Sequence, residues 1–546
     1  MKIIRRPGLA VERRLMIPWL GSPGGAPGRR RTSVADRALS LLIRDAALSF
    51  HSGDYAAADR GADAVLRMAP RSSLGPAIKA LIAAQSGDRA AAERRLASAR
   101  GWLRALRGML RARWGEHDAA RRDLEATRRI ERSAWACAAR AAADNRVGRF
   151  RSALKELAGM RSVLPSSPEP DLLASAIHLE QAQYAEAAAC LSRAARSAPA
   201  DAEIRRRLSR VYFVEGDLPS ARREIEAACR LSPGDAELRQ ERLRLCLLLD
   251  DEAASRSQLR EKWPPGVRDF WRAYAACRAG RFAESRRLFA AAEGACGDER
   301  LARTSALYRR VAQILSEAPK PQPPSGKELL ILGMGFRHPY QVSVEVLRAL
   351  RGCEEYFCNL SDSAVVDLLG LFGVPLRTIV FRRSNGQSTS CARIVMRAMK
   401  SLGRAGVVTR GQPVYYGRLA ARLVRDCAAR GIDCRVPPSV SIADLFPSLV
   451  GRVRGEALGF QVRDRRSLAG LDARLPVLIY NFSSGKERRE LCRKIRARHA
   501  AGEACWLLAG SGALEYEPVE TTVGEVEAAM LGADHAVTIL LPAVRS

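Results

Sequence analysis

The sequence has no long apolar run, few histidines and no closely spaced pair of cysteines. No stretch of about 18 uncharged apolar residues occurs, so no transmembrane helix is expected. The thirteen cysteines are scattered without a CxxC pair, and the six histidines do not join them at the spacing of a zinc site. We therefore expect no bound metal, and reduced, mostly buried cysteines in a cytoplasmic protein.

Acidic residues are outnumbered, with 59 Asp and Glu against 90 Lys and Arg and a net charge of +31. Such a field attracts acidic partners, including nucleic acid. The arginines are interspersed with Glu and Asp, however, and few aromatic residues are interleaved for base stacking. An arginine bias on solvated helix faces is therefore favoured over nucleic-acid binding.

The length of 546 residues is too great for one core and predicts two or three units. Residues 1–35 are basic and rich in Gly and Pro, and we interpret them as a disordered leader. The apolar piece Leu15–Leu20 contains Pro18 and is short for the core of a signal peptide.

Residues 36–318 are rich in Ala, Leu and Arg, with apolar residues at helical spacing. Two sets of turns, and one set of prolines, repeat with a step of 34 residues: Gly53 and Gly87; Gly148, Ala182 and Gly216; Pro165, Pro199 and Pro233. This pattern resembles the tetratricopeptide repeat, whose helix pairs stack into a superhelix with a groove that usually binds an extended peptide. The alternative is a generic helical array without a ligand.

The segment 319–326 contains four prolines, which favour an extended spacer and end the helical region. After it, short apolar segments alternate with helical ones, beginning with Glu328–Leu332 and Val342–Leu350. Such alternation predicts a mainly parallel sheet with helices on both faces. The predicted fold is therefore multi-domain, with an all-α superhelix followed by a two-lobed α/β domain at residues 327–437 and 438–546.

Three loops of this α/β part are candidates for chemistry. In the first, a strand ends in Gly333-Met334-Gly335, a turn that lets backbone approach a ligand closely. This turn alone is not a complete dinucleotide fingerprint, because His338 stands where the third Gly would be. The second loop is Gly411–Gly417, and the third is Pro437–Ile442.

In this order, the three loops resemble those of the tetrapyrrole methylase superfamily, whose members bind S-adenosylmethionine between two α/β domains and are usually dimeric. The resemblance implies a homodimer and a set of cofactor-binding residues: Gly333, Met334, Gly335, Pro339, Gly411, Gln412, Pro413, Val414, Tyr415, Ser441, Ile442 and Asn481. Asn481 lies in a further matching strand, Val477–Phe482. Gln412 and Pro438 replace the family's usual Asp and Gly, so a vestigial, non-catalytic site is an alternative.

The layout around Tyr340 and along Arg377–Arg397 resembles the borosin-type peptide N-methyltransferases. Asn385-Gly386 matches that group, whereas Arg382 and Arg383 replace its tyrosines and Thr389 replaces its arginine. Transfer of a sulfonium methyl depends mostly on positioning. The candidate catalytic residues, which would orient the acceptor or act as weak bases, are Tyr340, Tyr415 and Tyr416.

The sequence therefore predicts an S-adenosylmethionine-dependent methyltransferase acting on a peptide or protein recruited by the repeats. The chain ends a few residues after the last predicted strand, Ala536–Leu541, so we expect the acceptor in trans. Two alternatives remain: a methyltransferase of small molecules such as tetrapyrroles, and a non-catalytic scaffold.

Overall fold

The computed structural model describes most of the chain after residue 53. The described residues are 42, 45, 46, 49, 54–70, 74–86, 88–100, 102–114, 116–128, 134–146, 149–181, 183–317, 322, 324–335, 341–358, 363–379, 387–409, 411–413, 418–441, 461–464, 475–482, 485–509, 519–531 and 537–541. The chain divides into two compact units, one of Met1–Ile177, Gly459–Ala509 and Val519–Ser546, the other of His178–Leu458 and Gly510–Pro518. No helix within these described ranges is long and apolar enough to cross a membrane.

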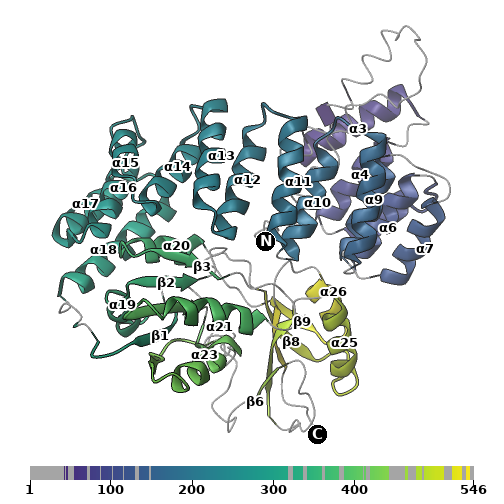
Figure 1. Cartoon of the computed structure of the whole chain (residues 1–546). Helices are drawn as coiled ribbons and strands as arrows, with labels where there is room; N and C mark the ends of the chain where they lie inside the picture. Colours follow the sequence, from purple (N-terminus) through teal and green to yellow (C-terminus); the bar gives the residue numbers. More distant parts are fainter. Residues whose placement is uncertain are drawn as a thin grey trace. The chain divides into compact units, whose positions relative to one another are not determined.

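The first unit begins with paired helices (Figure 1). These are α3 (Tyr55–Met68), α4 (Leu74–Ser86), α5 (Arg89–Arg95), α6 (Trp102–Arg113), α7 (His117–Arg128), α8 (Ala134–Arg146) and α9 (Phe150–Val163), and α10 (Glu169–Glu180) runs across the boundary between the units. The carboxylate of Asp54 caps α3, and that of Asp88 caps α5, each accepting an N–H from the first turn at 2.9 Å. Small residues such as Ala62 and Ala92 are fully buried, which lets neighbouring helices approach closely.

The second unit continues the helix pairs with the same chemistry. Its helices are α11 (Tyr184–Ser197), α12 (Ala202–Glu215), α13 (Leu218–Leu231), α14 (Ala236–Leu248), α15 (Glu252–Leu259), α16 (Val267–Arg278), α17 (Phe282–Ala295) and α18 (Glu299–Glu317). Gly216 ends α12 in the left-handed region, with φ 91°, and Asp217 caps α13. The predicted order of helix, Gly turn and helix is confirmed here.

The first sheet belongs to the second unit and contains β1 (Glu328–Gly333), β2 (Glu355–Cys358), β3 (Leu376–Thr378), β4 (Arg404–Thr409) and β5 (Asp433–Arg435). Its order is β3-β2-β4-β1-β5, and the described strand pairs are parallel, as predicted. Leu330 and Leu332 of β1 face one hydrophobic cluster, which includes residues of α19 (Val344–Leu350) and α20 (Ser363–Gly370). Leu329 and Ile331 face the other, with α21 (Gln387–Ala398) and α23 (Arg418–Ala428). Because both faces are covered, β1 is an uninterrupted buried run.

The repeats of the second unit pack directly on this sheet domain. Tyr274 of α16 donates a hydrogen bond to the Asp367 carbonyl at 2.9 Å, and Arg278 donates to the Gly370 carbonyl at 2.8 Å. Arg351, which follows α19, donates to the Leu315 carbonyl of α18 at 2.8 Å. One hydrophobic cluster runs through both parts. The expected Pro-rich spacer therefore does not separate independently packed bodies, because the apolar side of α20 uses the repeats as its cover.

The second sheet belongs to the first unit and contains β6 (Gln461–Asp464), β7 (Val477–Phe482), β8 (Ala504–Ala509), β9 (Val519–Thr522) and β10 (Val537–Leu541). Its order is β6-β7-β10-β8-β9; β6 and β7 are parallel, and the other described pairs are antiparallel. Helices α25 (Gly485–Arg496) and α26 (Val526–Leu531) accompany it. Strand β9 ends at Thr522, whose hydroxyl accepts the Glu525 amide at 3.3 Å just before α26 begins. The two-lobed α/β architecture is confirmed.

Candidate cofactor site

The first and second loops meet at the carboxyl edge of the first sheet. Strands β1 and β4 are parallel neighbours, so both loops leave the sheet at the same edge. The Met334 amide donates to the Thr409 carbonyl at 2.9 Å, and the Gly411 amide donates to the Gly335 carbonyl at 3.1 Å. Two loops that are distant in the sequence are thereby held together by their backbones.

Glycine is required in these loops by backbone conformation and by space. Gly335 has φ 69° and Gly411 has φ 67°, in the left-handed region that side chains disfavour. At Gly333, a Cβ atom would lie 2.0 Å from Ser439 Oγ and 2.2 Å from the Gly411 carbonyl oxygen. Gly333 therefore allows the first loop to pack directly against Gly411 and Ser439.

The third loop joins the other two. The Ser439 hydroxyl donates to the Gly411 carbonyl at 3.4 Å. The Ser343 hydroxyl, at the start of α19, donates to the Pro438 carbonyl at 3.2 Å. Ser441 is almost completely buried. The structure thus brings together described residues of all three predicted loops, while their role as a cofactor site stays a prediction.

Gln412 carries an unsatisfied acceptor within this arrangement. Its Oε1 atom is buried and has no hydrogen-bond partner among the described residues. A buried amide oxygen without a donor costs free energy, which a donor on a bound molecule would recover. Next to Gly411, this acceptor suits a ligand that carries N–H or O–H groups.

Several predicted site residues lie outside the described residues. These are Pro339, Tyr340, Val414, Tyr415, Tyr416 and Ile442, together with residues 382–386 of the borosin-like stretch. Asn481 lies in β7, and its side chain is also outside the described part. Thr389 lies in the first turn of α21, and Pro413 is buried. The catalytic tyrosines therefore stay predictions.

Other titratable groups near the sheet are unsuited to acid–base work. Burial raises the pKa of the Cys353 thiol to about 12, which keeps it protonated and inert at neutral pH. Burial also raises the pKa of Tyr356, whose hydroxyl donates to the Leu350 carbonyl at 2.7 Å. All thirteen cysteines are free and all but Cys296 and Cys434 are buried, as the sequence predicted. Among the described residues, no group of His, Cys, Asp or Glu could hold a metal ion.

Two residues of this arrangement, Ser343 and Ser439, were not among the predicted site residues. Ser439 lies inside the third loop, Pro437–Ile442, and its place in that loop is visible in the sequence. Ser343 caps α19, where its hydroxyl accepts the Val346 amide at 3.2 Å. A helix cap is visible in the sequence, but its second bond to Pro438, 95 residues away, is a tertiary contact that no local pattern contains.

Comparisons with known proteins agree with the repeat prediction. Residues 178–244 match the family model described as the tetratricopeptide repeat, which confirms the prediction for that part. A search of curated proteins finds no match to the sequence. Among solved structures, the chain is similar to a uroporphyrin-III C-methyltransferase from Thermus thermophilus complexed with S-adenyl homocysteine, at 18% identity over 39% of this chain and 91% of that one, with a TM-score of 0.32. It is also similar to the methyltransferase CobJ, at 15% identity over 40% and 95%, with a TM-score of 0.33.

Proposed function

We propose that this protein is an S-adenosylmethionine-dependent methyltransferase whose acceptor is a peptide or protein supplied in trans. The observation that carries the proposal is the meeting of three loops at Gly333, Gly411 and Ser439, with an unsatisfied buried acceptor at Gln412. These features support a ligand that is held largely by backbone groups. The loop sequences resemble those of the tetrapyrrole methylase superfamily, which supports the choice of cofactor.

The chain's own residues would bind and position the reactants. The cofactor supplies a methyl group on a sulfonium that is already activated for transfer. Gly333, Gly335 and Gly411 would allow close approach of the cofactor to the backbone, and Gln412 would accept a hydrogen bond from it. Tyr340, Tyr415 and Tyr416 are proposed to orient the acceptor or to receive a proton from it. A homodimer formed through the methyltransferase domain is part of the proposal.

The identity of the acceptor as a peptide is the more specific part of the proposal. Its supports are the borosin-like match at Asn385-Gly386 and the presence of tetratricopeptide repeats, which often bind extended peptides. A second candidate, methylation of a small molecule, is favoured by one observation. The first helices of successive pairs, including α14 and α16, contact the sheet domain through Arg244, Tyr274 and Arg278. Repeats used in this way would serve as structure rather than for recruitment.

Cofactor binding is tested by calorimetry with S-adenosylhomocysteine on the full chain. We expect binding in the wild type and at least about tenfold weaker binding in Gly333→Val, because the added side chain meets Ser439 and the Gly411 carbonyl. The matched control is Gly326→Ala, seven positions earlier, where a Cβ atom meets nothing within 4 Å. Absence of binding in the wild type would refute the proposal.

The acceptor is tested by transfer of labelled methyl groups from S-adenosylmethionine. The chain is incubated with a peptide library in one arm and with porphyrinogens in another. Label in the peptide fraction supports the peptide acceptor, and label in the porphyrinogen fraction supports the second candidate. Tyr415→Phe and Tyr416→Phe should lower the rate of transfer while leaving S-adenosylhomocysteine binding unchanged, if these hydroxyls contact the acceptor.

A further inference from the structure

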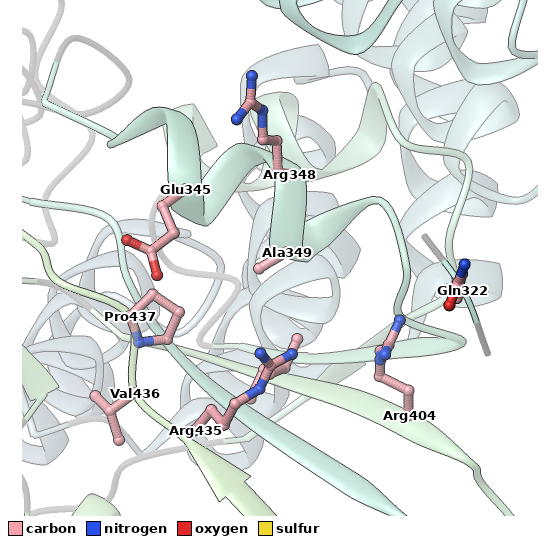
Figure 2. A pocket seen from close by; sticks show the side chains of 9 residues that line it. Gln322, Glu345, Arg348, Ala349, Arg404, Arg435, Val436 and Pro437 are labelled. Atoms are coloured by element: carbon pink, nitrogen blue, oxygen red, sulfur yellow. The ribbon is translucent and has the colours of Figure 1, made fainter. Parts of the chain in front are cut away.

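A cavity of about 540 Å³ lies on the first sheet, with Arg404, Arg435 and Glu345 in its lining (Figure 2). The loops leave the carboxyl ends of β1 and β4, whereas the cavity reaches Arg404, the first residue of β4. Leu330, Ala349, Val436 and Pro437 form apolar parts of its wall. The cavity meets the proposed cofactor site only at Pro437, the first residue of the third loop, and none of its lining residues belongs to the first or second loop.

Strand register places two arginines in this cavity. Glu328 pairs with Arg404 across β1 and β4, and Leu330 pairs with Arg435 across β1 and β5. Residues two apart in a strand share a face, so Glu328 and Leu330 lie on the same side of the sheet, and their partners lie there with them. This is the side covered by α19, from which Ala349 lines the cavity.

Glu328 holds both arginines in place. It is only 3% exposed, and its two carboxylate oxygens are shared between them. Arg435 Nε donates to Glu328 Oε1 at 2.5 Å, and Arg404 Nε donates to Glu328 Oε2. The Nη groups of Arg404 and the Nη1 group of Arg435 have no acceptor among the described residues. Two oriented guanidinium groups thus retain free donors, and the group of three carries a net positive charge.

Structural stability alone is a poor explanation for these charges. The pair of Arg404 and Glu328 is buried, and such a pair contributes little net stability because desolvation offsets the attraction. The Arg435 side chain is 62% exposed, and an ion pair with an exposed partner also adds little stability. Further along the same side of β1, the sheet uses only apolar residues, Leu330 and Leu332. Charged residues held in fixed positions at an open cavity are better explained by a ligand.

The surroundings define the chemistry of that ligand. Guanidinium groups with free donors bind the planar oxygens of a carboxylate or the oxygens of a phosphate. Apolar walls next to them favour a hydrocarbon portion. Glu345 and Arg348 of α19 also line the cavity. In Figure 2 the Arg348 guanidinium points away from Arg404 and Arg435, whereas the Glu345 carboxylate points toward Pro437, on the other side from Arg404. A second negative charge on the ligand would be repelled there.

We propose that this cavity binds a small organic monoanion, with its carboxylate or phosphate group on Arg404 and Arg435 and its apolar part against Leu330, Ala349 and Val436. The binding needs neither the cofactor nor methyl transfer. It can therefore be tested whether or not the proposed methyltransferase function is correct.

The test is calorimetry on the full chain with four probes: hexanoate, hexyl phosphate, inorganic phosphate and hexanol. We expect hexanoate or hexyl phosphate to bind at least about tenfold more tightly than inorganic phosphate or hexanol, because only the first two carry both required parts. Hexanoate binding alone identifies a carboxylate ligand, and hexyl phosphate binding alone identifies a phosphate ligand. Failure of both to bind at millimolar concentration would overturn the proposal.

Variants locate the binding. Arg435→Gln should weaken it at least about tenfold, whereas Arg397→Gln, an equal change of charge on the exposed side of α21, should leave it unchanged. Ala349→Leu keeps all charges and a good helix former but fills the cavity, so it should also weaken binding. If Arg435→Gln does not fold, Ala349→Leu still tests where the ligand binds. Wild-type affinity in both Arg435→Gln and Ala349→Leu would overturn the proposal.

Discussion

Two stretches of the repeat array cap their helices in the same way but belong to different hydrophobic cores. Both stretches, α3–α9 and α12–α18, contain helices that begin at aspartate caps, such as Asp88 and Asp217. The earlier stretch has its own hydrophobic cluster, which is rich in alanine. The later stretch shares one cluster with the first sheet domain. A repeat unit therefore fixes the shape of the helix pair but leaves open what the pair packs against.

The later stretch packs on the first sheet domain through aromatic residues and through the ends of its helices. Neighbouring ring centroids lie 5.2–6.4 Å apart within one group, made of Phe270, Trp271, Tyr274, Phe289 and Tyr308. From this group, the Tyr274 hydroxyl reaches the sheet domain. Contacts with that domain also come from the ends of α12 and α18, through the Val214 and Leu315 carbonyls. These helices are a structural part of the sheet domain.

In the earlier stretch, ion pairs around a buried carboxylate hold neighbouring helices together instead. The Asp123 side chain of α7 is 3% exposed and pairs with three arginines of α6: Arg104, Arg107 and Arg111. Arg107 Nη2 donates to Asp123 Oδ1 at 2.7 Å, and Arg107 Nη1 donates to the Leu96 carbonyl at 3.0 Å. This network ties α6 and α7 together within the array. The comparison predicts that damage to each stretch has different consequences for the sheet domain.

The largest effect is expected from deletion of residues 1–320. This change removes the cover of α20 and exposes a large apolar surface, so the remaining fragment should aggregate or lose amide protection in α20 and β2. Hydrogen exchange followed by mass spectrometry measures this. The control is deletion of residues 1–166, which keeps α10–α18 and should leave β1 and α20 protected. A soluble fragment from residue 321 with native protection would disprove the structural role of the later stretch.

Tyr274→Ala should have the next largest effect. The side chain is 1% exposed, and its removal should cost about 3–5 kcal/mol through lost burial and a cavity beside Gly370. Exchange should rise in α16 and α20. Tyr274→Phe removes only the hydrogen bond to the Asp367 carbonyl, and should cost about 1 kcal/mol.

A matched change in the earlier stretch separates the two cores. Leu106→Ala in α6 removes a fully buried side chain and should cost about 2–5 kcal/mol. Its exchange effects should be confined to the earlier helices. If Leu106→Ala and Tyr274→Ala raised hydrogen exchange in α20 equally, the two stretches would not have separate cores.

The sequence predicted the elements better than their assembly. The unit of helix, Gly turn and helix at Gly216 and the parallel pairing of strands such as β1 and β4 follow from local patterns, and the structure has both. The packing of α14 and α16 on the sheet domain does not follow, because Tyr274 and Arg278 occupy ordinary positions in an amphipathic helix and their partners are backbone carbonyls. The meeting of Gly333, Gly411 and Ser439 was predictable only through the family resemblance, since loop contacts leave no periodic signal.

Asp123→Asn should destabilise the earlier stretch by about 3 kcal/mol at pH 7, because three arginines lose their buried carboxylate. Burial alone would raise the pKa of Asp123, but hydrogen bonds from Arg107 and its charge outweigh this effect and lower the pKa. A lowered pKa gives stability that is complete above the unfolded value of about 3.9 and is lost as the pH falls through the folded value. The difference between wild type and D123N should therefore shrink below about pH 4.

Hydrogen exchange in α6 and α7 at pH values from 7 to 3 measures this difference. The control is Glu125→Gln, an exposed carboxylate on the same helix that pairs with Arg121 at 3.9 Å. It should change stability by less than about 0.5 kcal/mol at any of these pH values. A wild-type advantage over D123N that stayed constant down to pH 3 would show that the carboxylate charge is not the cause.

The smallest predicted effect compares the same cap in the two stretches. Asp88→Ala and Asp217→Ala each remove a carboxylate that accepts an N–H from the first turn, at 2.9 and 3.1 Å, and each should cost about 1 kcal/mol. The local loss should be equal, because the chemistry is equal. Only Asp217→Ala should raise exchange in β3, since the adjacent Gly216 contacts Thr378 and the Thr378 hydroxyl donates to the Val214 carbonyl at 3.3 Å. Equal exchange in β3 for both variants would mean that the cap and the contact with the sheet domain are energetically independent.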